Sequence, residues 1–182
     1  MLRSKKEKVK REMEKGNRKP AAVVSFSLFT FSFLLSSCGG DPANAVPANA
    51  KMGRCPVCGM NVDSSDQWAA EIYYVDGTKI VFESLGDLLS FYTAPQEYKA
   101  SEYQQDRANV LRTTVKDYQT KETIDARGAR LVYKSKVEGP MGPEFLAFAH
   151  KEDADAFAAA NGGEVVPFRE VSPAMAKDLR KK

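Results

Sequence analysis

Two cysteines spaced Cys-x-x-Cys in a short turn constrain this chain more than any other feature. Cys55 and Cys58 enclose Pro56 and Val57 and are followed by Gly59, so the segment is predicted to form a tight knuckle instead of a helix or strand. In such a turn the two sulfur atoms converge on one point. Because thiolate and thioether ligands are soft, they select Cu(I) over magnesium or calcium. The knuckle is therefore a candidate metal site.

Methionines in turns add thioether groups to this candidate site. Met60 follows the second cysteine by two positions, and Met52 precedes the first by three. Met141 lies in another turn rich in glycine and proline, at 138–143. A methionine in a turn is less easily explained as core filling than one on an apolar face. The predicted ligands are Cys55, Cys58, Met60 and Met141, with Met52 and His150, the single histidine, as further candidates.

Two other functions remain open for the motif. Cys-Pro-Val-Cys-Gly is also half of a structural zinc site, although zinc prefers four protein ligands and no second Cys-x-x-Cys is present. A thioredoxin-like oxidoreductase opens a long helix with its cysteine pair, whereas residues 59–66 are turn-like and precede a strand. An incomplete, sulfur-rich ligand shell suits a carrier that must release Cu(I). With one histidine no Ser-His-Asp set is expected, so the chain is predicted not to be an enzyme.

The first 50 residues are predicted to form a leader and a tether. Residues 1–20 are polar and basic, and 21–35 are apolar, which is too short to span a bilayer but fits a signal peptide. The sequence Leu35-Ser36-Ser37-Cys38-Gly39 resembles the bacterial lipobox, which implies cleavage before Cys38 and lipid attachment to it. The predicted segments are a signal peptide at 1–37 and a lipidated, flexible tether at 38–50.

Removal of this leader changes the charge of the protein. The whole chain has 27 Lys and Arg against 24 Asp and Glu. Residues 1–37 contain nine of the basic residues and three of the acidic ones, which leaves 18 basic and 21 acidic residues in the rest of the chain. A weakly acidic protein has no electrostatic footprint for nucleic acid, so no nucleic-acid partner is expected. Because Gly39 and not aspartate follows Cys38, the anchor is predicted to lie in the outer membrane and not the inner one, facing the periplasm.

The remainder predicts an α+β fold of two related strand-strand-helix-strand modules. The first module, residues 51–128, has a strong hairpin signal at Asp76-Gly77 and a helix capped by Ser84. Three cysteines are too few for a disulfide scaffold, so the fold must rest on an apolar core. The predicted elements of the first module are strands 67–75 and 78–82, a helix from Ser84 to Pro95, a strand at 109–118 and a turn at 119–128.

The second module, residues 129–182, is predicted to repeat this order. The spacing Phe-x4-Asp-x3-Phe occurs in both modules, at 82–91 and at 148–157, where a strand ends and a helix begins. Such a repeat indicates two copies of one structural unit. The predicted elements of the second module are strands 129–133 and 145–148, a helix at 151–160, a strand at 164–171 and a short helix after Pro173.

Taken together, these motifs resemble a known family. The knuckle Cys55-Pro-Val-Cys-Gly-Met-Asn-Val62, the strand-ending Phe82, and the run from Met141-Gly-Pro-Glu144 to Phe168 are similar to the NosL family of copper chaperone lipoproteins, over residues 51–171. The first half also resembles the YHS/TRASH metal-binding modules. Those modules usually have a cysteine after the strand-ending phenylalanine, where this chain has Glu83.

The resemblance implies a function and partners. It implies treble-clef-like modules that bind Cu(I) in the periplasm and deliver it for nitrous oxide reductase maturation in denitrification, with an ABC-type membrane complex as partner. By position, Met141 corresponds to the methionine of the family's Met-Gly turn. Some relatives have a histidine shortly after that methionine, where this chain has Pro143.

Overall fold

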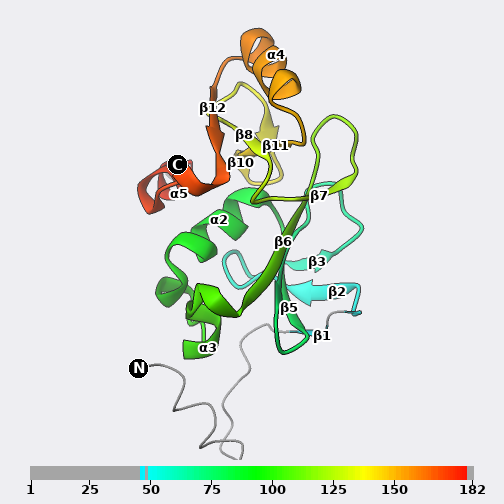
Figure 1. The fold of residues 1–182 in the computed structure, drawn as a ribbon, viewed down its shortest axis with the longest axis vertical. Helices are drawn as coiled ribbons and strands as arrows, with labels where there is room; N and C mark the ends of the chain where they lie inside the picture. Colours follow the sequence, from blue (N-terminus) through cyan, green and yellow to red (C-terminus); the bar gives the residue numbers. More distant parts are fainter. Residues whose placement is uncertain (1–45, 48, 180–182) are drawn as a thin grey trace, which may run out of the picture. The chain divides into compact units, whose positions relative to one another are not determined.

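The computed structural model describes residues 46–47 and 49–179 of the chain (Figure 1). The predicted signal peptide and most of the predicted tether, Cys38 included, lie outside the described residues. The described part confirms the predicted α+β class. Its elements are β1 (Val46–Pro47), β2 (Met52–Arg54), β3 (Asn61–Asp63), β4 (Ala70–Tyr74), β5 (Thr78–Phe82), α2 (Leu85–Thr93), η1 (Pro95–Tyr98), α3 (Glu102–Gln105), η2 (Arg107–Asn109), β6 (Val110–Lys116), β7 (Thr123–Asp125), β8 (Arg130–Tyr133), β9 (Glu138–Gly139), β10 (Gly142–Pro143), β11 (Leu146–Phe148), α4 (Lys151–Asn161), β12 (Glu164–Pro167), η3 (Phe168–Glu170) and α5 (Pro173–Asp178), where η denotes a 3-10 helix.

Antiparallel pairing organises the described strands into two main sheets and two small hairpins. The larger sheet has the order β1-β5-β4-β6-β7, and the smaller one has the order β11-β8-β12. The remaining pairs are β2-β3 and β9-β10. The order β5-β4-β6 recurs as β11-β8-β12. In each case the first strand is central, its hairpin partner lies on one side, and the strand that follows the helix lies on the other.

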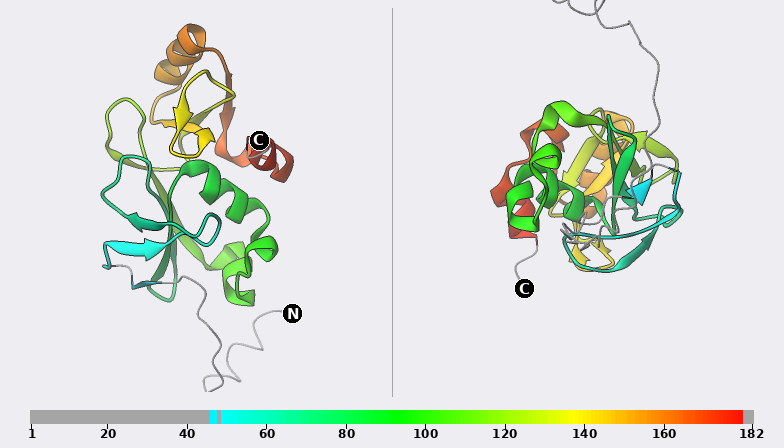
Figure 2. Two further views of the ribbon diagram at one scale, coloured as in Figure 1. Left: turned by 180° about the vertical axis from the view of Figure 1, so that it is seen from behind. Right: turned by 90° about the horizontal axis from the view of Figure 1, so that it is seen from below.

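Helix α2 covers one face of the larger sheet (Figure 2). Ile72 and Phe82 of the sheet are buried in the same apolar cluster as Leu88 and Leu89 of the helix. The helix begins where the sequence predicts, because the Ser84 hydroxyl accepts a hydrogen bond from the backbone N–H of the third helical residue at 3.3 Å. The first turn of α2 is therefore fixed both by its cap and by the apolar core.

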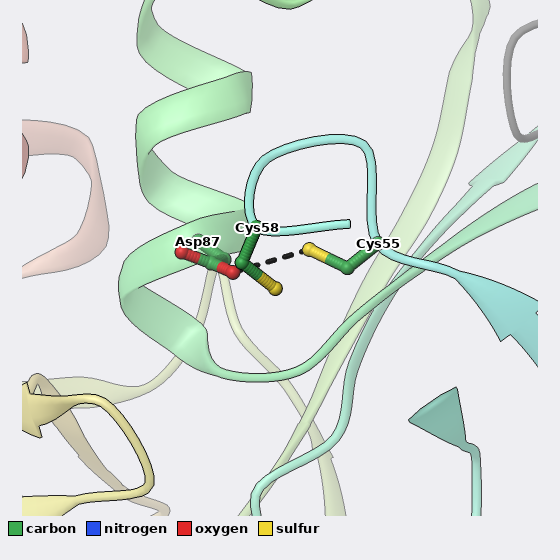
Figure 3. A group of neighbouring side chains, drawn as sticks. All are labelled: Cys55, Cys58 and Asp87. Carbon is green, nitrogen blue, oxygen red and sulfur yellow. Dashed lines mark hydrogen bonds between the residues drawn. The ribbon is translucent and has the colours of Figure 1, made fainter. Parts of the chain in front are cut away.

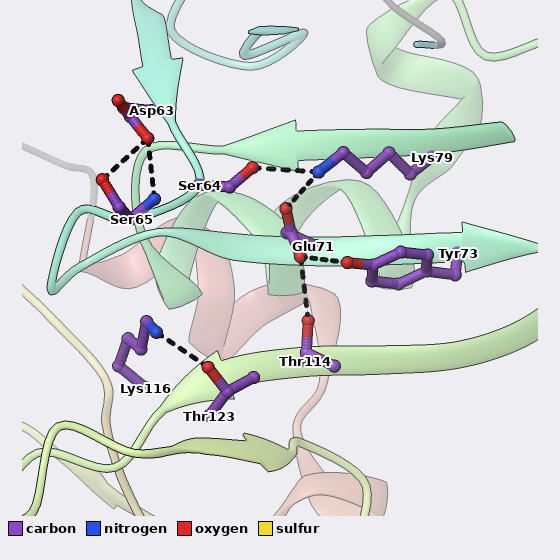
Figure 4. Close-up of polar contacts among 9 residues, drawn as sticks. All are labelled: Asp63, Ser64, Ser65, Glu71, Tyr73, Lys79, Thr114, Lys116 and Thr123. Carbon is purple, nitrogen blue, oxygen red and sulfur yellow. Dashed lines mark hydrogen bonds and ion pairs between the residues drawn. The ribbon is translucent and has the colours of Figure 1, made fainter. Parts of the chain in front are cut away.

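A buried polar network lies on the opposite face of the same sheet (Figure 4). The ammonium of Lys79 lies 2.6 Å from Oε1 of Glu71 and donates to Oγ of Ser64 at 2.9 Å. The hydroxyls of Tyr73 and Thr114 donate to Oε2 of Glu71. Ser64 directly follows β3, so the network ties the open end of the β2-β3 hairpin to the sheet.

Two predictions of local structure are wrong. The segment 119–128 is not only a turn, because Thr123–Asp125 forms β7 and pairs with β6. The strand predicted at 164–171 ends at Pro167 and continues as η3, because proline has no N–H with which to extend a ladder. The predicted tail helix is confirmed as α5, with Ser172 as its cap.

The larger of the two apolar clusters among the described residues contains side chains from both halves of the fold. Phe145, Val166 and Phe168 of the second half lie in the same buried cluster as Leu85 and Leu88. None of the described helices is both long and apolar enough to cross a lipid bilayer.

Candidate metal centre

The cysteine turn is closed by two backbone hydrogen bonds at the tip of the β2-β3 hairpin. The N–H of Cys55 donates to the carbonyl of Met60, and the N–H of Gly59 donates to the carbonyl of Cys55, both at 2.9 Å. Gly59 has a φ of +77°, a left-handed conformation that glycine adopts without strain. This local geometry brings the two thiols to the same side of the turn (Figure 3).

A carboxylate from α2 completes a cluster with the two thiols. The thiol of Cys55 donates to Oδ2 of Asp87 at 3.1 Å, and the ligand atoms of Cys55, Cys58 and Asp87 all lie within 4.8 Å of one another. Cys55 is fully buried, and Cys58 is partly exposed. Donors at this separation need only small shifts to bind a single ion.

A second carboxylate approaches from the residue before the helix cap. The thiol of Cys58 donates to Oε2 of Glu83 at 3.3 Å. Glu83 occupies the position at which YHS/TRASH modules usually have a cysteine. Neither Glu83 nor Asp87 is among the residues predicted as ligands. The signals that could have found them are the place of Glu83 directly after the strand-ending Phe82 and the place of Asp87 in the first turn of α2.

The surroundings of the thiols keep them protonated in the metal-free protein. Burial and, after it, the carboxylate of Asp87 raise the pKa of Cys55 above the ordinary value. Burial is also the main cause that raises the pKa of Cys58, and Asp87 and Cys55 add to it. A metal can bind the thiolates only by displacing these protons. Metal binding at this centre is therefore coupled to proton release.

Three other residues predicted as ligands from the sequence are exposed. Met60 is 50% exposed at the end of the cysteine turn, and Met52 is 55% exposed at the start of β2. His150 is exposed at the N-terminal end of α4 and makes no capping bond with its side chain. His150 does not belong to the cluster of Cys55 and Cys58 found among the described residues.

Met141 lines a cavity that a member of the cluster, Asp87, also lines. A cavity of about 270 Å³ is lined by both Met141 and Asp87, and Met141 is 51% exposed. Glu144 is buried in the wall of this cavity, and burial raises its pKa to about 7. The β9-β10 hairpin thus places Met141 at the wall of a cavity that Asp87 also lines. The other residues that line the cavity are Ser84, Gly86, Pro143, Ala176 and Leu179.

Comparison with known proteins identifies the family. A family model described as NosL matches residues 48–176. This chain belongs to the NosL family. It is 28% identical over 126 residues to the copper-binding lipoprotein NosL of Stutzerimonas stutzeri, a match that covers 68% of this chain and 64%, or just under two thirds, of that relative. The fold is similar to the crystal structure of the copper chaperone NosL from Shewanella denitrificans, with a TM-score of 0.55 and 27% identity over 66% of this chain and 90% of the other.

The donor set of this NosL-family chain suits a thiophilic ion. Two thiolates from one turn form a soft site that matches Cu(I), which is satisfied by few ligands. The carboxylates of Asp87 and Glu83 are harder donors, and with both thiolates they could also surround Zn²⁺. The geometry therefore fits either ion, and the sulfur atoms are the donors that both ions require.

Proposed function

We propose that this protein is a metallochaperone that binds one Cu(I) through the thiolates of Cys55 and Cys58. The observation that carries the proposal is the convergence of both thiols and the carboxylate of Asp87, whose ligand atoms lie within 4.8 Å of one another. Copper is preferred over zinc because the relatives described above are named as a copper-binding lipoprotein and a copper chaperone. A carrier of this kind catalyses no reaction, so no enzymatic activity is proposed.

The residues of the centre have different roles in loading and release. Cu(I) replaces the protons of two thiols, so that two S–H bonds are exchanged for two Cu–S bonds and two protons leave. Asp87 and Glu83 already accept hydrogen bonds from these thiols and are the nearest acceptors for the departing protons. Cys58 is the more exposed of the two thiols, so it is the ligand that an acceptor displaces first.

Thioethers complete the proposed shell. Met60 belongs to the same turn as the two cysteines, and Met141 lines the cavity that Asp87 also lines. Both side chains are about half exposed, at 50% and 51%, so either sulfur can move towards a bound ion without disrupting the core. A weak third ligand of this kind is compatible with a carrier that must release its ion.

The proposed client is nitrous oxide reductase, reached together with an ABC-type membrane complex. This part of the proposal rests on the family resemblance. Attachment to the outer membrane through a lipid on Cys38, facing the periplasm, is proposed from the lipobox and from the relative named as a lipoprotein. Mass spectrometry of the mature protein should find an acylated N-terminal cysteine, and Cys38→Ser should release the protein from membranes or leave it unprocessed.

Copper titration of the reduced protein comprising residues 39–182 tests the proposed site. Under anaerobic conditions this protein should bind one Cu(I), and Cys55→Ser or Cys58→Ser should weaken binding more than Met60→Leu. Met141→Leu should have an intermediate effect, and His150→Ala the smallest. X-ray absorption should show sulfur-dominated copper of low coordination number. Unchanged copper affinity in the Cys55/Cys58 double variant would refute the site.

Two further measurements separate the alternatives. If zinc were structural, a chelator would unfold the purified protein, whereas we expect the demetallated protein to stay folded on its apolar core. If the cysteines formed a thiol-disulfide oxidoreductase, isomerase activity on a scrambled substrate would depend on Cys55, whereas we expect none. Loss of copper from nitrous oxide reductase in a deletion strain tests the client.

A further inference from the structure

Residues 117–122 form a turn with the same construction as the cysteine turn, residues 55–60. The N–H of Asp117 donates to the carbonyl of Glu122 at 2.8 Å, and the N–H of Lys121 donates to the carbonyl of Asp117 at 2.9 Å. In the cysteine turn the same two bonds join the first residue to the sixth and the fifth residue to the first. The fifth residue is left-handed in both turns, with φ of +77° in the first and +64° in the second.

The strands that flank the two turns also match. Each turn connects the two strands of an antiparallel hairpin. These strands are β2 and β3 for the first turn, and the end of β6 and β7 for the second. An aspartate closes each hairpin by accepting a hydrogen bond from the backbone N–H two residues further on. The paired residues recur 62 positions later in the chain: Met52–Asp63 and Arg54–Asn61 in the first hairpin, Thr114–Asp125 and Lys116–Thr123 in the second.

This correspondence places Asp117 where the first turn has Cys55, and Thr120 where it has Cys58. Asp117 is 2% exposed. Its Oδ1 accepts from the backbone N–H groups of Gln119 and Thr120, both at 2.8 Å, and its Oδ2 accepts from that of Ala149 at 2.7 Å. The backbone N–H groups of Cys58 and Glu83, at the equivalent places, act on the sulfur of Cys55.

The carboxylate of Asp117 is held in its charged form. Burial alone would raise its pKa, but the N–H groups of Thr120, Ala149 and Gln119 outweigh burial and lower the pKa below the ordinary value. Three backbone donors thus satisfy one buried anion. In the first hairpin a metal bound to the thiolate of Cys55 would hold the turn together. In the second hairpin the carboxylate of Asp117 holds the turn together through hydrogen bonds.

We infer that residues 114–127 are a second copy of the metal-binding hairpin, in which the carboxylate of Asp117 occupies the place of a thiolate and makes a metal unnecessary. The second repeat then begins at Thr114, within β6, and not at residue 129. Asp153, the counterpart of Asp87 in the Phe-x4-Asp-x3-Phe spacing, lines a cavity of about 340 Å³ together with Tyr118 and Gln119 of this turn. The second hairpin therefore has the backbone arrangement of the first, with Asp117 and Thr120 in place of the two cysteines.

Moving the cysteines from one turn to the other tests this inference. In the full chain carrying Cys38→Ser, the pair Cys55→Ser and Cys58→Ser should abolish tight Cu(I) binding. Adding Asp117→Cys and Thr120→Cys to that variant should restore one Cu(I) per chain. The matched control places the two cysteines at Asp106, which is exposed, and Asn109, which is partly exposed; these positions have the same spacing, and the control should restore no binding. A folded variant with cysteines at 117 and 120 that binds no more copper than this control contradicts the inference.

Hydrogen exchange of the protein without added metal supplies a test that does not depend on the proposed function. The amides of Thr120 and Ala149 should be protected in the metal-free protein, and Asp117→Ala should speed their exchange by at least about tenfold. Asp66→Ala, which removes a similar bond to a backbone N–H in an exposed turn, should leave these two amides unchanged. No effect of Asp117→Ala on the exchange of these two amides overturns the inference. A separate measurement with Cu(I), which rests on the proposed function, should leave residues 117–122 unchanged, and added protection of these residues by copper also overturns the inference.

Discussion

The backbone N–H of Gly86 donates to Oε1 of Glu144 across 2.6 Å, and a Cβ added at Gly86 would lie 2.5 Å from the same oxygen. Gly86 directly precedes Asp87 in the first turn of α2, whereas Glu144 follows the β9-β10 hairpin. A carboxylate from the second half of the chain therefore holds the helical turn that supplies a carboxylate to the cysteines. The geometry of the candidate metal centre depends on both halves of the fold.

Gly86→Ala should destabilise the protein by about 1–3 kcal/mol, because the new methyl group forces a buried carboxylate out of its place. It should also weaken Cu(I) binding, because Asp87 lies next to it in the chain. Chemical denaturation measures the first effect. Gly128→Ala is the matched control, since its added Cβ would meet only the carbonyl of Asp125 at 3.7 Å, and it should change stability by less than about 0.5 kcal/mol. Equal effects of the two substitutions would contradict the steric argument.

Glu144→Gln should remove a pH dependence of stability. Burial raises the pKa of Glu144 from 4.5 to about 7, so the stability that its protonated form contributes is complete below pH 4.5 and is lost as the pH rises through 7. Glutamine keeps the oxygen that accepts from Gly86 and Phe145 but cannot ionise. The variant should therefore be more stable than the parent at pH 8, by on the order of 2–3 kcal/mol. Urea unfolding at pH 4.5, 6 and 8 measures this gain, and a difference that does not grow with pH would count against it.

Copper affinity should rise steeply with pH. The pKa values of Cys55 and Cys58 are both raised above the ordinary 9.0, so each thiol releases one proton near neutrality when it binds Cu(I) as a thiolate. The apparent affinity should increase by about a hundredfold per pH unit between pH 6 and 8 for two released protons. Competition with a Cu(I) chelator of known pH dependence measures the slope. Cys58→Ser should reduce it to about tenfold per unit, and a slope that Cys58→Ser leaves unchanged would exclude that thiol as a ligand.

Lys79→Met should be strongly destabilising, because it leaves the carboxylate of Glu71 buried without its ion pair. Removal of one partner of a buried pair costs about 3–5 kcal/mol, and replacing both partners by apolar residues recovers most of that loss. The double variant Lys79→Met with Glu71→Leu should therefore be more stable than the single variant. Lys151→Met is the matched control, because Lys151 pairs with Asp155 at the surface, and it should cost less than about 1 kcal/mol. Thermal or chemical unfolding of the three variants decides the comparison.

Features set by neighbouring residues could be predicted from the sequence. The cysteine turn, the hairpin at Asp76-Gly77 and the cap at Ser84 all depend on φ angles and hydrogen bonds within a few positions. The strand Thr78–Phe82 and the start of α2 were consequently located to within a residue. The family resemblance rested on the same local motifs, and it is confirmed by the family match.

The groups that surround the thiols were decided only by tertiary structure. Glu83 and Asp87 lie 25 and 32 positions from the cysteines that they contact, and in the sequence they look like ordinary acidic residues at the start of a helix. Asp117 falls near the end of the strand predicted at 109–118, and nothing in the sequence indicates its role, since the three backbone donors that hold its carboxylate come from two segments that meet only after folding. The sequence alone determined where sulfur is concentrated, since Pro56 and Gly59 place the two cysteines in one turn. Which carboxylates face that sulfur depends on how α2 and the sheet pack, and no local pattern records that packing.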